Sequence, residues 1–189
     1  MNIFTAELIG TALLLLLGNG VVASCALKNT HASGSGWIVI TAAWGFAVFT
    51  GVTVAGPVSG AHLNPAVTLG LAMIGKTPWE LVPTYFAGEM LGGMLGAFLV
   101  WVYFRDQFNS TEDEAPKKAA FCTGPAIRNL PANFFCEVLA TFVLVFVVIA
   151  AGLYTTNAKG DAVTLGWLGA LGVALLIVVI GTGLGGPTG

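Results

Sequence analysis

The stretch GPVSGAHLNPAVT, residues 56–68, decides the fold of this chain. Asparagine is among the best residues at a helix N-cap and proline suits the first helical position, so Asn64 and Pro65 predict the start of a helix. That helix, 64–75, carries no charged residue, which argues against a surface helix. At about 1.5 Å per residue it covers roughly half of the ~30 Å hydrocarbon core of a bilayer. The sequence therefore predicts a half-helix inside a membrane.

The composition agrees with a membrane setting. Hydrophobic residues make up 56% of the 189 residues and charged residues 8%, against about 25% charged in an ordinary soluble domain. The net charge of −2 and the scattered basic residues give no face for nucleic acid. The three cysteines have neither zinc-ligand spacing nor the pattern of a disulfide framework, so no metal site is expected.

Five apolar stretches are long enough to span a bilayer, which needs about 20 helical residues. They are residues 3–27, 37–58, 79–104, 133–154 and 162–184. The first has no basic leader and is too long for a signal-peptide core, so we interpret it as a retained span. The longest polar segment, about 105–131, is too short to fold alone. We expect one membrane channel domain over 1–189.

The residues before the half-helix predict a cavity. Backbone groups at membrane depth need partners, so the non-helical stretch 56–63 must line a cavity or be buried in protein. We expect Gly60, Ala61, His62 and Leu63 to be extended, with carbonyls that accept hydrogen bonds from a solute. The positive end of the half-helix repels cations, and its cap leaves amide donors. An Asn-Pro pair alone is commonly a turn, and its surroundings favour a site for a neutral solute.

An internal repeat emerges when the chain is compared with itself at an offset of 130 residues. Glu7 meets Glu137, and Gly56-Pro57 meets Gly186-Pro187; the other matches are Phe4 with Phe134, Thr11 with Thr141, Leu14 with Leu144, Gly36-Trp37 with Gly166-Trp167, and Gly51 with Gly181. Three spans or span equivalents per copy reverse the second copy, which predicts an inverted repeat. We expect a first repeat over about 1–104, a connecting loop over about 105–132, and a second repeat over about 133–189.

The second repeat is expected to be incomplete. Its copy of the opening stretch begins at Gly186 and stops at Gly189, before the counterpart of Asn64, which the offset of 130 places near position 194. The expectation is a chain truncated at its C-terminus, with five full spans and one half-helix, and without the second half-helix and the sixth span.

The HLNPAVT motif, the half-helix, GPVSG and the repeat resemble the aquaporin and glycerol facilitator family, also called the major intrinsic proteins, over all 189 residues. The resemblance implies an all-α membrane protein, a right-handed helical bundle in which two half-helices starting with NPA meet at the pore centre. It also implies a homotetramer with one pore in each protomer. Here the NPA residues are Asn64, Pro65 and Ala66.

The resemblance also suggests the aquaglyceroporin subtype. Glycerol-conducting members have Trp in the second span and Gly in the fifth, and Trp44 and Gly181 match these positions. No histidine follows His62, so the filter histidine of water-selective members is absent. A Trp face gives the carbon chain of a polyol an apolar wall. Two alternatives remain open: Trp44 as an interfacial or packing residue, and Gly181 as a helix-packing residue.

Three carboxylates, Glu7, Glu89 and Glu137, lie inside apolar spans, where ionisable residues are costly and usually functional. The matched positions of Glu7 and Glu137 predict that they support the two half-helix loops by accepting hydrogen bonds from backbone amides. Glu89 stands where many members of the family have Gln. A proton relay through these residues is the alternative.

A further pattern concerns packing: Gly88, Gly92 and Gly96 form a small-residue stripe that predicts close contact between helices.

Together these observations predict a passive, multi-pass channel in the cell membrane for glycerol and other small uncharged solutes, including water. We expect no catalysis, no cofactor and no metal. The alternatives are a channel for another neutral solute, such as protonated lactic acid or urea, and a proton-coupled transporter.

Overall fold

The computed structural model describes residues 1–152 and 166–188, and this part of the chain is helical with no strand. The long helices are α1 (Ile3–Ala26), α2 (Trp37–Ser59), α4 (Val82–Tyr103), α7 (Leu130–Gly152) and α8 (Ala170–Leu184). Shorter elements are α3 (Pro65–Met73), η1 (Trp79–Leu81), α5 (Arg105–Ser110), α6 (Glu114–Ala119) and η2 (Gly166–Gly169). The protein is an all-α helical bundle.

Four of the five predicted spans are helices long and apolar enough to cross a membrane: Ile3–Ala26, Trp37–Ser59, Trp79–Tyr103 and Leu130–Gly152. The last begins three residues before the predicted 133, and residues 153 and 154 of that prediction lie outside the described chain. The fifth prediction, 162–184, is described from Gly166 onward. It consists there of one 3₁₀ turn followed by the 15 residues of α8, which are apolar but shorter than a full span.

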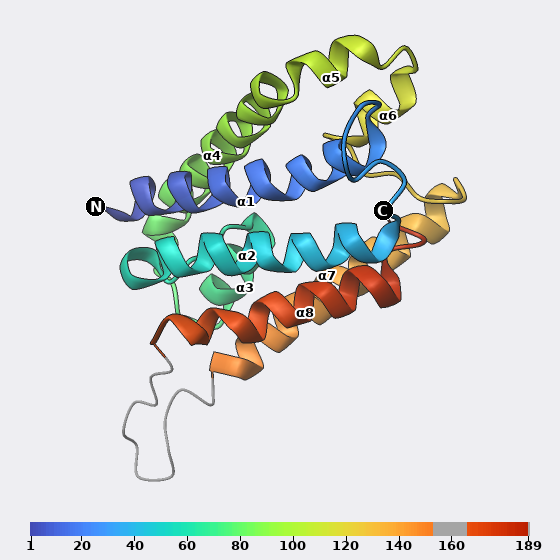
Figure 1. Ribbon diagram of the computed structural model, residues 1–189. Helices are drawn as coiled ribbons and strands as arrows, with labels where there is room; N and C mark the ends of the chain where they lie inside the picture. The colour runs from blue at the N-terminus through green and yellow to red at the C-terminus, as the bar shows by residue number, and fades with distance from the viewer. Residues whose placement is uncertain (153–165, 189) are drawn as a thin grey trace.

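Helix α1 lies between α4 and α2 (Figure 1). It packs against α4 on one side and α2 on the other, α8 packs on α2, and α3 contacts α4 and α7. The predicted glycine stripe explains the contact between α1 and α4. A Cβ atom at Gly88 would lie 2.8 Å from the Phe4 carbonyl oxygen, and one at Gly96 would lie 2.6 Å from that of Ala12. The prediction that this stripe serves close packing is confirmed.

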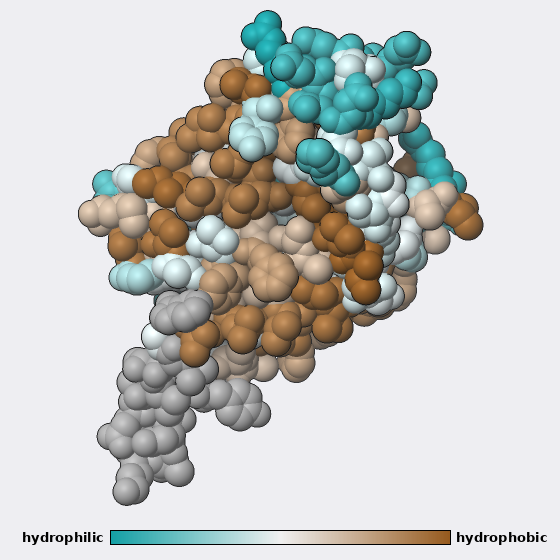
Figure 2. Space-filling model, viewed as in Figure 1, coloured by the Kyte–Doolittle hydropathy of each residue, from teal (hydrophilic) through white to brown (hydrophobic). Residues whose placement is uncertain are grey.

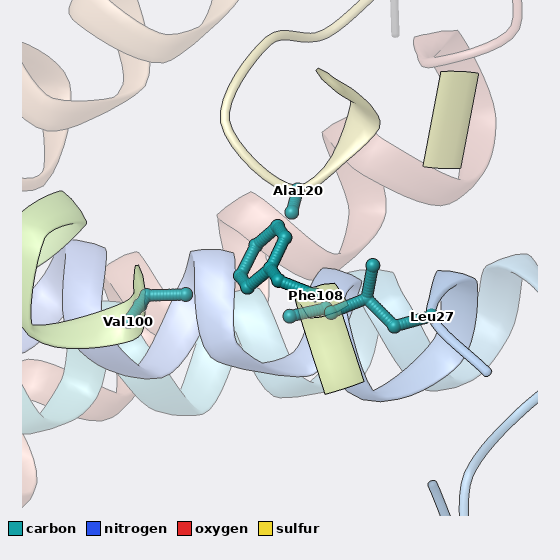
Figure 3. Packing of buried hydrophobic residues seen from close by; sticks show 5 residues of the cluster. Leu27, Val100, Phe108 and Ala120 are labelled. Atoms are coloured by element: carbon teal, nitrogen blue, oxygen red, sulfur yellow. The ribbon is translucent and has the colours of Figure 1, made fainter. Parts of the chain in front are cut away.

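The connecting loop contains two short helices that cover one end of the bundle. Its buried core consists of Ala23 and Leu27 at the end of α1, Val100 of α4, Phe108 of α5, and Ala120 (Figure 3). Thr111 is 1% exposed and accepts a hydrogen bond from the Lys28 amide at 3.0 Å. The loop is therefore packed on the ends of α1 and α4.

The surface agrees with a bilayer environment. Hydrophobic residues cover the sides of the long helices, whereas hydrophilic residues gather at one end, over α5 and α6 (Figure 2). Large apolar side chains stand exposed along α4 and α7, among them Met94, Phe98, Phe142 and Phe146. In water such surface would be costly, so it faces lipid or other protein. The chain is a multi-pass membrane protein.

Candidate functional site

The site begins where α2 ends. We predicted a non-helical stretch over 56–63, and this was wrong for its first four residues, because α2 continues through Pro57 to Ser59. Proline inside a helix removes one backbone hydrogen bond without always ending the helix. The end comes at Gly60, whose φ of 81° is left-handed and whose amide donates to the Gly56 carbonyl at 3.1 Å.

The loop from Gly60 to Leu63 differs from the predicted extended ladder. Gly60, Ala61 and Leu63 all have positive φ, 53° at each of the last two. A left-handed backbone costs a residue with a side chain about 1–2 kcal/mol, so something must hold Ala61 and Leu63 in place. The loop is a strained turn whose geometry comes from its surroundings.

Glu7 of α1 supplies much of that support. Its carboxylate is 0% exposed and accepts hydrogen bonds from the amides of His62 at 3.0 Å and Leu63 at 2.7 Å. It also accepts one from the Ser59 hydroxyl at 2.5 Å. Hydrogen bonds to a charged group contribute about 1.5–3 kcal/mol each, which outweighs the backbone strain.

Asn64 caps the half-helix α3. Its side-chain oxygen accepts a hydrogen bond from the Ala66 amide at 2.8 Å, and Pro65 occupies the first helical position. The half-helix, predicted over 64–75, runs from Pro65 to Met73 with Asn64 as its N-cap. Capping uses only the side-chain oxygen, so the Asn64 Nδ2 group remains as a hydrogen-bond donor for the space in front of it.

A second buried carboxylate, Glu89 of α4, holds the other side of the loop. Thr68 of α3 donates to its Oε1 at 2.7 Å, and the Nδ1 atom of His62 lies 2.9 Å from the same Thr68 oxygen. A hydroxyl has one proton to donate, so His62 Nδ1 must be the donor to Thr68 when Glu89 accepts. Its Nε2 atom, 3.5 Å from the Thr77 hydroxyl, is then an acceptor. The four side chains, from Thr77 through His62 and Thr68 to Glu89, form one directed chain of hydrogen bonds.

Tyr85 of α4 completes the support. Its ring stacks on that of His62, with centroids 4.0 Å apart, and its hydroxyl donates to the Ser59 carbonyl at 2.6 Å. Sequence reasoning missed Ser59, Thr68, Thr77 and Tyr85 as parts of this site. The available signal was their polarity within or beside apolar segments, which does not reveal their partners.

The loop and the half-helix border a cavity of about 440 Å³ between α1, α2, α7 and α8. The described residues that line it include no charged side chain; they are Leu14, Leu15, Trp44, Val48, Val52, Gly60, Ala61, His62, Leu63, Asn64, Val67, Leu144, Val148, Gly169, Val173 and Ile177. Six predicted site residues are brought together here, namely Trp44, Asn64 and the four loop residues. The described lining is mainly apolar, and the loop residues 60–63 and Asn64 contribute its polar part.

Other predicted residues lie elsewhere. Pro65 and Ala66 form the first turn of α3 behind Asn64. Gly181 lies outside the cavity lining, at the contact between α8 and α2, where its carbonyl accepts from Trp37 Nε1 at 2.8 Å and a Cβ atom would meet Thr41. Glu137 is exposed on α7, and the described residues offer its side chain no hydrogen bond.

Three comparisons with known proteins point to the same family. The pattern of the family described as major intrinsic protein matches residues 1–186. A probable glycerol uptake facilitator of Thermotoga maritima is 46% identical over 189 residues, 100% of this chain and 77% of that protein. The D/L-lactic acid transporter of Lactiplantibacillus plantarum is 38% identical over 187 residues, 97% of this chain and 74% of that protein.

A solved structure shares the fold. The X-ray structure of the aquaglyceroporin from Plasmodium falciparum matches with a TM-score of 0.80 and 29% identity, over 97% of this chain and 72% of that one. Fold, capped half-helix and sequence therefore agree: the chain belongs to the major intrinsic protein family.

Proposed function

We propose that this protein is a passive channel that conducts glycerol and other small uncharged solutes, including water, through the cavity beside Asn64. The observation that carries the proposal is the lining of that cavity, whose described residues are uncharged and mostly apolar, with the loop 60–63 and Asn64 as the polar part. A polyol presents the same two faces, a carbon chain on one side and hydroxyls on the other. The glycerol uptake facilitators among the relatives support this choice of solute.

Residue roles follow from the chemistry of such a solute. Trp44, with Val48 and Leu14, offers the carbon chain an apolar wall, while Asn64 Nδ2 donates to a hydroxyl oxygen. We expect carbonyls of the loop 60–63 to accept from the hydroxyl protons in place of water, in the left-handed geometry that Glu7 stabilises and not as an extended ladder. Cations are excluded because the N-terminus of α3, with its partial positive charge, faces the same space. Passage requires no covalent step.

A panel of solutes tests the proposed selectivity. The protein is reconstituted in liposomes, and the entry of glycerol, urea and lactic acid at acid pH is followed by light scattering. We expect glycerol to enter fastest relative to protein-free liposomes. Fastest entry of lactic acid would instead favour the activity named for the Lactiplantibacillus plantarum relative at 38% identity.

A proton-coupled transporter is the second candidate, and buried Glu89 is the observation that favours it, because one carboxylate oxygen of this side chain has no hydrogen-bond partner among the described residues. For a passive channel we expect Glu89→Gln to keep glycerol entry within about twofold, because the Gln oxygen still accepts from Thr68. Glu89→Leu, which removes that acceptor, should cost about 1–3 kcal/mol of stability. A loss of uptake in Glu89→Gln, together with collapse of wild-type uptake by a protonophore, would contradict passive conduction.

We further propose that the channel is a homotetramer. The exposed apolar residues of α4 and α7 give a protomer ample surface for neighbouring copies as well as for lipid. Crosslinking in native membranes followed by gel electrophoresis checks the assembly, and a ladder that stops at the monomer would contradict it.

A further inference from the structure

The ring of Trp44 packs against α1 at Gly18, a position without a side chain. At Gly18, which is buried, a Cβ atom would lie 2.5 Å from Cε3 and from Cζ3 of Trp44 and 2.7 Å from its Cδ2. All three of the nearest atoms belong to this one ring. Ordinary carbon contacts are about 3.5–4.0 Å, so a methyl group at Gly18 requires the ring to move by about 1 Å.

The cavity borders the same ring. Leu14, one helical turn before Gly18, and Val48, one turn after Trp44, line the cavity together with Trp44 itself. Helix α1 blocks the ring on the Gly18 side. A ring displaced from Gly18 therefore changes the wall that Trp44 gives to the cavity.

The internal repeat shows the reverse arrangement of sizes. The offset of 130 pairs Gly18 with Val148 of α7, and Trp44 with Ala174 of α8. The first repeat thus has a small residue beside a large one, whereas the second has a medium residue and a small one at the same two positions. Val148 lines the cavity and Ala174 is 2% exposed.

We propose that Gly18 is a specificity-determining residue of the channel, because its missing side chain sets how far the Trp44 ring projects into the cavity. The inference rests on the proposed conduction of polyols. Gly18 does not touch the solute; it positions the residue that does. A larger residue at position 18 should therefore lower the permeability of the wider of two chemically similar solutes more than that of the narrower one.

The test compares glycerol with ethylene glycol, a smaller diol of the same chemistry, in liposomes that contain the protein. In Gly18→Ala we expect the ratio of glycerol to ethylene glycol permeability to fall by about tenfold, the usual effect of one added methyl group on a pocket. In a Trp44→Ala background the same Gly18→Ala change should leave the ratio unaltered, because no ring remains to be displaced.

Gly92→Ala is the matched control. Gly92 of α4 is equally crowded against α1, but its nearest atoms are the Leu8 carbonyl and the Thr11 side chain rather than Trp44. This control should lower stability and leave the permeability ratio unchanged. Equal losses of glycerol and ethylene glycol permeability in Gly18→Ala, or the same fall in ratio with Trp44→Ala present, would overturn the inference. So would a Gly18→Ala protein that misfolds and is not rescued by Trp44→Ala.

A readout independent of transport separates the inference from the proposed function. When Trp37, Trp79, Trp101 and Trp167 are replaced by Phe, Trp44 is the one remaining tryptophan, and its fluorescence reports the surroundings of its ring. We expect Gly18→Ala to shift the emission and its quenching by acrylamide, and Gly92→Ala to leave both unchanged. Unchanged Trp44 emission in Gly18→Ala would overturn the inference, whereas a wild-type protein that conducts neither glycerol nor ethylene glycol would overturn the proposed function.

Discussion

Glu7 is the residue on which the loop geometry depends most. It is fully buried, and three donors converge on its two oxygens, two of them amides of a backbone with left-handed residues. Hydrogen bonds to a carboxylate are stronger than those to a neutral acceptor. A glutamine at this position would also replace one acceptor oxygen by an NH₂ group, which would face the donors of the loop.

We therefore expect Glu7→Gln to lower the stability of the protein by about 1.5–3 kcal/mol, the contribution of one charged hydrogen bond, and to reduce glycerol permeability. Thermal unfolding in detergent and flux in liposomes measure the two effects. Glu80→Gln, at an exposed residue of η1, is the control and should change neither. A Glu7→Gln protein as stable as the control would contradict this role.

Asn64 combines two roles in one side chain, capping through Oδ1 and donation through Nδ2. Asn64→Asp keeps the acceptor for the Ala66 amide and removes the donor. We expect this variant to retain thermal stability but to lose most glycerol conduction. Asn64→Ala, which loses the cap as well, should in addition cost about 0.5–2 kcal/mol. If Asn64→Asp conducts glycerol like the wild type, the amide does not serve the solute.

At the residue scale, the sequence predicts the roles that residue type alone indicates. Asn64 before Pro65 indicates a cap, and a glutamate in an apolar span indicates a buried partner. It does not predict the positive φ of Ala61 and Leu63, because residues with side chains rarely adopt it and the stabilising bonds come from Glu7, more than fifty residues earlier. Gly18 was missed because its importance depends on which ring lies opposite.

Among the elements, the contact between α1 and α4 offers the sharpest test of packing. Gly92 meets the backbone of α1 there, whereas its neighbour Gly93 has nothing within 4 Å of a Cβ atom. We expect Gly92→Ala to destabilise the protein by about 1–3 kcal/mol through overpacking. Gly93→Ala should be neutral or stabilise the helix by about 0.5–1 kcal/mol. Thermal unfolding of the pair decides, and equal midpoints would contradict the close approach of these helices.

Helix positions could be predicted within a few residues because long apolar runs leave few choices in a membrane. Helix ends were harder. We predicted a non-helical stretch from residue 56, but α2 continues through Pro57 and ends at Ser59, before Gly60. The predicted span 162–184 contains an α-helix only from Ala170 onward, because a 3₁₀ turn over Gly166–Gly169 precedes α8. Apolar composition does not distinguish these two helix types.

At the scale of the whole molecule, matched positions of the internal repeat contribute to the cavity from both halves of the chain. Leu14 of α1 and Leu144 of α7, matched by the offset of 130, both line the cavity. Of the matched pair, Glu7 is buried on its loop and Glu137 is exposed on α7, and the support of a second half-helix loop by Glu137 stays a prediction. The repeat was readable from sequence because its matches include rare Glu and Gly-Pro positions, whereas the cavity and its lining required the packed helices.

The most direct test of the proposed channel is the rate at which glycerol enters liposomes that contain the protein, followed by stopped-flow light scattering. We expect entry well above that of protein-free liposomes, in proportion to the gradient, without saturation at moderate concentration, and altered by Trp44→Ala. Glycerol entry no faster than through bare lipid, with Trp44→Ala indistinguishable from the wild type, would contradict the account.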